Sequence, residues 1–226
     1  MSTEGLAQLL LLAIPILIAI TFHEAAHGFV ANFFGDDTAK RQGRVTLNPI
    51  KHIDPFGTLI LPGLLLYFTG FMFGFAKPVP VDQSKLRNPR FHMIWVAIAG
   101  VVMNVLLAFV SAFLLAGLLS TNAVTTDLIP NILLASISVN FILAVFNILP
   151  IPPLDGSKVL ASLLPADLAR AHLTLEPLGF VFLMLALVVL PLIGNQLNMN
   201  LDLFAWVVLI PADALSAWLQ RLVGIG

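Results

Sequence analysis

Long apolar segments, separated by short polar ones, dominate the pattern of this 226-residue chain. A membrane-spanning helix needs about 20 mainly apolar residues. Four segments qualify, and they lie at residues 6–34, 93–119, 132–149 and 178–193. Residues 203–219 form a weaker candidate, because Pro211 and Asp213 interrupt it. The pattern therefore predicts an all-α polytopic membrane protein.

One further apolar segment, residues 58–75, is punctuated by proline and glycine. Basic residues flank it on both sides, at 35–56 and 77–91, and the positive-inside rule places both flanks in the cytoplasm. Residues 58–75 must then cross an even number of times, which indicates a re-entrant or β-hairpin element between the first two firm spans. We expect about five or six membrane segments in total.

The remaining polar segments set the orientation of the chain. Lys158 and Arg170 follow the third firm span, whereas residues 121–127 and 195–202 contain no lysine or arginine. The positive-inside rule therefore predicts that the N-terminus lies outside and that the basic segments lie in the cytoplasm.

Composition narrows the class of protein further. Hydrophobic residues make up 59% of the chain and charged residues 10%, against about 25% charged residues in soluble domains. A net charge of -1 without a basic stripe gives no reason to expect a nucleic-acid partner. The chain has no cysteine, so only histidine and carboxylate side chains remain as candidate metal ligands.

Two histidines and a glutamate, in the sequence His23-Glu24-Ala25-Ala26-His27, lie inside the first apolar segment. Such groups are costly to bury in lipid unless a partner compensates them. Histidines at i and i+4 share one helical face and can bind one metal ion, beside which the glutamate can act on water. The alternative is a pair of satisfied core histidines beside a buried glutamate.

A catalytic zinc needs a third protein ligand and keeps its fourth position for water. Asp155 follows the proline-rich residues 147–154, which place it on non-helical backbone at the cytoplasmic end of a span. It is either that ligand or the N-cap of a helix beginning near Ser157. Other candidates have the character of loop, structural or interfacial residues: Asp36, Asp37, His52, His92, His172 and Glu176.

Several stretches of this chain resemble the site-2 protease family (peptidase M50) of intramembrane zinc metalloproteases. HEAAHG and NILPIPPLDG are similar to the two signature motifs of that family. The similarity covers about residues 18–160 and points to the compact bacterial type without a PDZ or CBS module. The stretches that carry it lie at residues 23–28, 43–49, 52–58, 77–81, 99–104 and 147–156.

The resemblance assigns roles to individual residues. It implies that His23, His27 and Asp155 bind one zinc ion and that Glu24 is the general base. Asn147 matches the family asparagine that stabilises the oxyanion, and Asn104 matches a central-helix asparagine that supports the site. An edge strand can hold an unwound substrate, and residues 43–47 or part of 58–75 are the candidates for it, the alternative being a plain shielding hairpin.

The resemblance also implies a function and a location. It predicts hydrolysis of single-span membrane proteins, such as anti-sigma factors or remnant signal peptides, in a bacterial inner membrane with the site open to the cytoplasm. We expect one membrane-embedded domain over residues 1–226, with a motif-bearing core at about 6–165 and C-terminal membrane segments at about 175–224. A metal transporter and a catalytically silent scaffold of the same fold are the competing interpretations.

Overall fold

The computed structural model describes residues 3–69, 74–121, 127–197 and 199–225. Every regular element within these residues is helical, and they contain no strand. Four of the described helices are long and apolar enough to cross a membrane: Leu11–Phe33, Pro89–Ser120, Leu128–Asn147 and Glu176–Gly194. The prediction of an all-α membrane protein is confirmed, whereas the predicted number of crossings stays a prediction.

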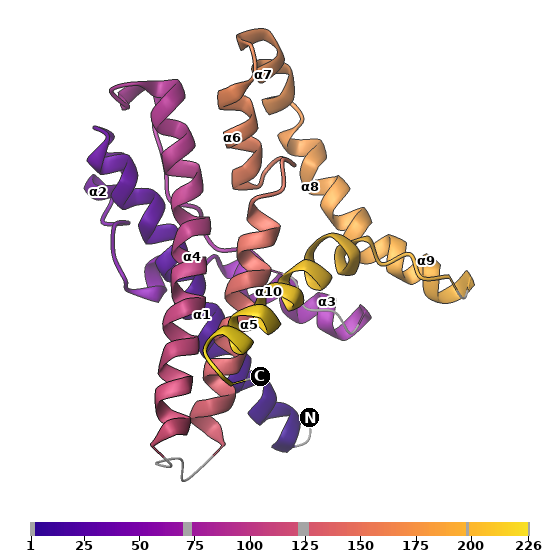
Figure 1. Ribbon diagram of the computed structural model, residues 1–226. Helices are drawn as coiled ribbons and strands as arrows, with labels where there is room; N and C mark the ends of the chain where they lie inside the picture. Colours follow the sequence, from indigo (N-terminus) through magenta and orange to yellow (C-terminus); the bar gives the residue numbers. More distant parts are fainter. Residues whose placement is uncertain (1–2, 70–73, 122–126, 198, 226) are drawn as a thin grey trace.

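Helices α1 (Thr3–Phe33), α4 (Pro89–Ser120) and α5 (Leu128–Asn147) form the central bundle (Figure 1). The Asn88 side chain accepts the backbone N–H of Phe91 and so begins α4, whose first residue is a proline. Small residues let helices approach closely within a membrane. They alternate with large ones where α4 meets α5: Ala108, Ala112, Leu115, Ile137 and Phe141.

Helix α10 (Ile210–Leu222) follows a π-helical turn (Ala205–Leu209) and packs across α4 and α5 (Figure 1). Ala212 and Leu219 belong to the same apolar core as the α4–α5 contact. The weaker span expected at residues 203–219 is therefore helical, although it is not among the four membrane-crossing candidates.

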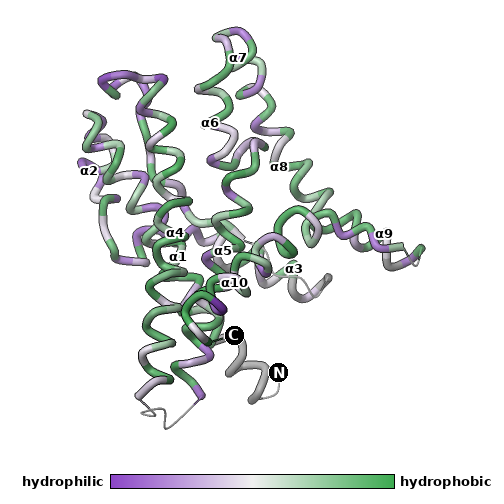
Figure 2. Tube along the Cα trace, viewed as in Figure 1, coloured by the Kyte–Doolittle hydropathy of each residue, from purple (hydrophilic) through white to green (hydrophobic). Residues whose placement is uncertain are grey.

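Two short helices, α6 (Asp155–Leu163) and α7 (Ala166–Leu173), cap the end of the bundle at which α4 begins (Figure 1). Arg90, near the start of α4, holds this cap: its Nε donates to the carbonyl of Ser162 at 2.6 Å and its guanidinium also reaches Leu163 at 3.0 Å. Figure 2 shows polar residues gathered at this end and apolar residues along the helices below it.

The chain continues through α8 (Glu176–Met184), a π-helical turn (Leu185–Val189) and α9 (Leu190–Leu197), which lean away from the bundle in Figure 1. Leu183 and Leu187 pack against Leu154, directly before α6. The last apolar segment is thereby tied to the residues that precede Asp155.

Residues 55–69 are helical, as a π-helical turn (Pro55–Ile60) followed by α3 (Leu61–Thr69). The β-hairpin alternative is wrong for the described residues, because helical hydrogen bonds occupy the backbone that a strand would need; residues 70–73 of this segment lie outside the described part. Residues 43–47, the other candidate for an edge strand, form an irregular loop.

The two ends of this segment are joined by hydrogen bonds. The backbone N–H of Phe75 donates to the carbonyl of Gly57 at 3.0 Å, and the Thr58 hydroxyl donates to the carbonyl of Phe75 at 2.9 Å. The next residues, 77–81 (the proline strip), then run non-helically towards α4.

Candidate metal centre

Three side chains from two distant parts of the sequence meet inside the bundle. His23 and His27 lie one turn apart on α1, and Asp155 is the first residue of α6. The two Nε2 atoms are 3.0 Å apart, and each lies 3.1 Å from Oδ2 of Asp155. All three residues are buried, and no comparable group of histidine and carboxylate ligands occurs in the part of the chain that the structure describes.

Both histidines point their Nε2 lone pairs into this cluster. Nδ1 of His23 lies 2.6 Å from Oδ1 of Asn104, and Nδ1 of His27 lies 2.7 Å from the backbone carbonyl of Val96. Each partner oxygen is an acceptor, so each Nδ1 carries the proton and donates it. In the neutral ring, Nε2 is then the free acceptor.

The carboxylate of Asp155 is oriented from its other side. Lys158 Nζ donates to Oδ1 at 3.0 Å, which leaves Oδ2 for the histidines. Burial raises the pKa of the Asp155 carboxyl, whereas the neighbouring Lys158 ammonium lowers it. Paired with Lys158, Asp155 is a carboxylate, as a metal ligand must be.

The structure corrects the predicted backbone around Asp155. The residue opens α6 rather than lying on an extended strip, and Leu154 occupies the N-cap position. The Asp155 side chain faces the histidines, so the N-cap interpretation is wrong.

The chemistry of these three donors suits zinc. Two neutral imidazoles and a carboxylate are typical ligands, and three protein ligands leave the fourth tetrahedral position open. Tetrahedral ligands at zinc–ligand distances of about 2.0–2.1 Å are about 3.3 Å from one another, close to the 3.0–3.1 Å separations found here. Without a cation, three acceptor lone pairs would face one another in a buried space, which is costly.

Glu24 lies beside this cluster and is held by the proline strip. Its Oε2 accepts the backbone N–H of Val79 at 2.7 Å. Glu24, His27, Asp155 and Lys158 line one pocket together with apolar residues of the strip and of α4. A carboxylate, an ammonium and the metal-binding cluster therefore share one small space.

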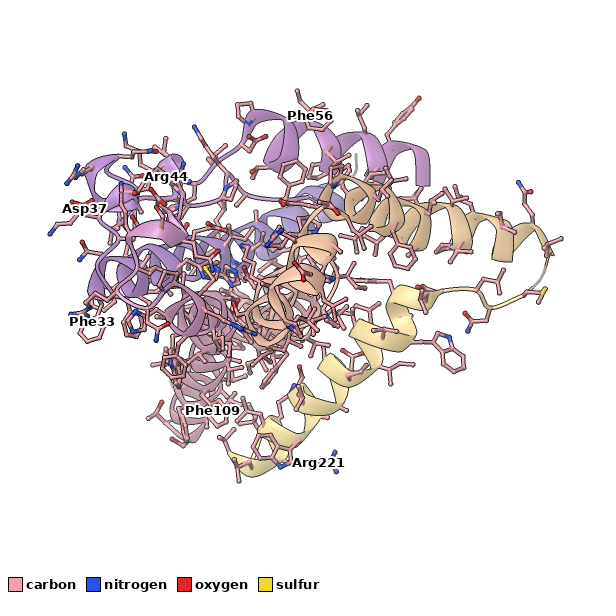
Figure 3. The ribbon with its side chains drawn as sticks, turned by 90° about the horizontal axis from the view of Figure 1, so that it is seen from above. Phe33, Asp37, Arg44, Phe56, Phe109 and Arg221 are labelled. Carbon is pink, nitrogen blue, oxygen red and sulfur yellow. The ribbon has the colours of Figure 1, made fainter. Side chains whose placement is uncertain are left out.

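Buried polar groups fix the proline strip in place. Arg44 donates to the carbonyl of Lys77 at 2.6 Å, and Asp36, which has no exposed surface, accepts the N–H of Asp82 at 2.7 Å. Arg44 lies in the loop after the short helix α2 (Thr38–Arg41), on the side of the molecule away from Arg221 (Figure 3). Asp36 has the character of a structural anchor rather than of the ordinary loop carboxylate that we expected.

Of the two asparagines assigned by resemblance, Asn104 contacts a histidine of the cluster directly. Asn147 lies at the end of α5, where its amide donates to the carbonyl of Leu143 at 3.1 Å, and it is not among the residues that line the pocket. His52 makes the structural hydrogen bond that we expected, to the carbonyl of Thr46 at 2.9 Å.

Sequence reasoning missed three residues at this site. Lys158 stands one helical turn after Asp155, a spacing that could have suggested the ion pair. Gly100 gives the histidines room, since a Cβ there would lie 2.6 Å from both Nε2 atoms. Asn140, a second buried amide in an apolar helix, contacts Asn104; polar residues of this kind in a span are a signal in themselves.

Two histidines on a helix long and apolar enough to span a membrane form a buried cluster with the carboxylate of a short neighbouring helix, which defines a membrane metalloenzyme. The model of peptidase family M50 matches residues 117–189, which include Asp155. The chain is similar to a Bacillus subtilis protein named "Putative zinc metalloprotease YwhC", at 42% identity over 186 residues, which cover 80% of this chain and 81% of that protein. The chain belongs to peptidase family M50, the site-2 protease family, and it is a zinc metalloprotease.

More distant relatives agree with this assignment. "Putative zinc metalloprotease Rip2" of Mycolicibacterium smegmatis is 30% identical over 76% of this chain and 64% of that protein. Its namesake in Mycobacterium tuberculosis strain H37Rv is 29% identical over 74% of this chain and 62% of that protein. No solved structure matches the chain.

Proposed function

We propose that this zinc metalloprotease cuts transmembrane protein substrates within or beside the bilayer, as in regulated intramembrane proteolysis. One observation carries the proposal: His23, His27 and Asp155 converge inside a bundle of membrane-length helices, with Glu24 beside them in one pocket. In this proposal the three converging residues hold zinc and Glu24 is the general base.

The chain's own residues supply orientation and proton transfer. When bound, zinc acts as a Lewis acid that acidifies water and polarises the scissile carbonyl. Glu24 takes a proton from the attacking water and passes it to the leaving amine. The Val79 N–H, bonded to one oxygen of Glu24, fixes the carboxylate so that the other oxygen is free to accept that proton. Asn147 stabilises the oxyanion only after its amide leaves the carbonyl of Leu143.

The proposed substrates are single-span membrane proteins, with anti-sigma factors and remnant signal peptides as the two classes. A substrate helix must unwind locally before cleavage, because each backbone carbonyl inside a helix is engaged in a hydrogen bond. The apolar lining of the pocket, by Val81, Met93, Val96 and Ala97, suits apolar side chains of such a segment.

We further propose a bacterial inner-membrane location with the site opening to the cytoplasm and residues 57–76 re-entrant. The ends of that segment meet at Gly57 and Phe75, which supports re-entry. Lys85 Nζ donates to the Thr38 hydroxyl at 2.8 Å, which supports one common side for the two basic segments. Because the chain has no cysteine, the variants Lys40→Cys and Lys85→Cys each carry a single label site. Labelling of these two from opposite sides of the membrane would contradict the topology.

The function is tested by cleavage of a tagged single-span substrate by the purified protein. We expect a zinc chelator to abolish cleavage and added zinc to restore it. Glu24→Gln should remove activity while the protein still binds zinc, since the amide cannot accept the proton. Its matched control is Glu176→Gln, an exposed glutamate outside the pocket, which should cut normally. Full activity of Glu24→Gln would refute the mechanism.

Substrates can then be identified with the same variant. The Glu24→Gln protein, crosslinked in cells, should retain single-span proteins that the native enzyme releases as fragments. Retention of only soluble proteins or of multi-span transporters would contradict the proposed substrate class.

A further inference from the structure

A row of buried polar side chains continues from His23 into the bundle. Oδ1 of Asn104 accepts a hydrogen bond from Nδ1–H of His23, and the Nδ2–H of Asn104 donates to Oδ1 of Asn140 at 2.9 Å. Asn140 Nδ2 in turn donates to the backbone carbonyl of Ser136 at 2.8 Å, and the hydroxyls of Ser136 and Ser111 are 2.8 Å apart. Asn104 and Asn140 have no exposed surface at all. Polar groups this far from water need a reason beyond packing, because apolar residues would fill the same space.

The direction of every hydrogen bond in this row follows from its far end. The carbonyl of Ser136 can only accept, so Asn140 must turn its NH₂ group towards it and its oxygen towards Asn104. Asn104 must then present its own NH₂ group to Asn140, and its oxygen faces His23. A second contact, from Asn104 to the carbonyl of Ala19 at 3.4 Å, has the same direction but is longer. His23 is therefore obliged to carry its proton on Nδ1.

We infer that Asn140 is a positioning residue that fixes, through the Asn104 amide, the tautomer in which His23 offers Nε2 to the metal. The inference rests on the proposed metal site. The backbone carbonyl of Ser136 on α5 thus sets the tautomer of His23 on α1, through the side chains of the two asparagines. Groups that orient metal ligands change metal affinity by about 10–100-fold when they are removed.

The test measures zinc affinity of the full-length protein in detergent, by competition with a chromophoric chelator. Asn104→Leu should weaken zinc binding by about 10–100-fold, and Asn140→Leu by about fivefold, as expected for one lost hydrogen bond. Because Asn140 acts through Asn104, the double variant should bind zinc as Asn104→Leu does, within about twofold. Ser111→Ala, which alters only the far end of the row, should bind zinc normally. A double variant whose loss of zinc affinity equals the product of the two single losses would overturn the inference.

A second experiment, in the Asn104→Asp variant, distinguishes a positioning role of Asn140 from a role in packing α4 against α5. Asn104→Asp offers an acceptor oxygen in either orientation, so His23 keeps its proton on Nδ1 whatever stands at residue 140. In that background Asn140→Leu should cost no zinc affinity, although it still removes a contact between α4 and α5. An equal loss in both backgrounds would mean that Asn140 only holds the helices together, and would overturn the inference. Unchanged zinc binding in His23→Ala would instead refute the metal site, and the role of Asn140 with it.

Discussion

Gly100 offers a sharp test of the site, because one added methyl group meets two metal ligands at once. A Cβ at residue 100 would lie 2.6 Å from Nε2 of His23 and 2.6 Å from Nε2 of His27, whereas ordinary contacts begin at 3.4 Å. Relief therefore needs a shift of 0.8 Å (3.4 minus 2.6). Both rings are tied through Nδ1 to Asn104 and Val96, which belong to the same helix as Gly100. The rings cannot retreat without breaking those bonds.

Gly100→Ala should therefore abolish zinc binding while the protein remains folded. Metal–ligand distances tolerate only about 0.2 Å, so a shift four times larger removes at least one ligand. We expect zinc affinity to fall by at least about 100-fold, more than for the loss of a group that only orients a ligand. Overpacking costs about 1–3 kcal/mol, and replacing glycine by alanine in a helix returns about 0.5–1 kcal/mol. The net loss of stability is then about 0–2.5 kcal/mol.

Gly117→Ala is the matched control, because it lies on the same helix and its added Cβ would meet no atom within 4 Å. It should bind zinc normally and unfold at an equal or slightly higher temperature. Zinc affinity by chelator competition and thermal unfolding in detergent measure the two effects separately. Native zinc affinity in Gly100→Ala would refute the reasoning, since the metal would then not need the observed ligand positions.

Three further predictions concern the surroundings of the site. Gly179→Ala places a Cβ 1.8 Å from the backbone carbonyl of Pro152, so it should lower thermal stability by about 1–3 kcal/mol or more; an unchanged melting temperature would contradict the packing of α8. Arg44→Met leaves two strip carbonyls without their donor and should cost about 1–3 kcal/mol, with faster limited proteolysis in the proline strip; native protease resistance would contradict its anchoring role. A hydrogen bond from Ser84 lowers the pKa of Asp82 in the folded protein. The stabilisation that Asp82 contributes is therefore fully present above its unfolded pKa of about 3.9. It is lost as the pH falls through the lower folded pKa. The melting-temperature difference between the native protein and Asp82→Asn should thus be constant from about pH 7 to 5 and shrink only below about pH 4; a difference that vanishes near pH 6 would refute it.

The sequence was sufficient to find the residues whose chemistry conflicts with their surroundings. His23, Glu24 and His27 stand out in an apolar span because burying them without a partner is costly. Asp155 stands out because prolines interrupt the chain before it. Side-chain pattern alone could not decide between a ligand and a helix cap, since that choice depends on which helix ends lie opposite each other in space.

Other features depend on contacts that no local pattern encodes. The glycines and prolines of residues 58–75 left a re-entrant and a β-hairpin element as alternatives, and the segment is helical over the described residues up to Thr69. A proline is tolerated in the first turn of a helix, and Pro55 occupies that position in the π-helical turn before α3. Asp36 has the sequence context of a loop carboxylate, but it is buried and accepts a hydrogen bond from the backbone N–H of Asp82, 46 residues away. The role of Asn140 likewise appears only when α4 and α5 are placed side by side.

The division of the cluster between α1 and α6 has a consequence for biosynthesis. The first two ligands are made early, but the third follows 128 residues later. A nascent chain that has inserted only α1, α4 and α5 offers a pair of imidazoles, too few for a closed zinc site. We therefore expect metal to bind only once α6 has been made and has docked, so that the chain carries no complete metal site while its first three long helices are being inserted.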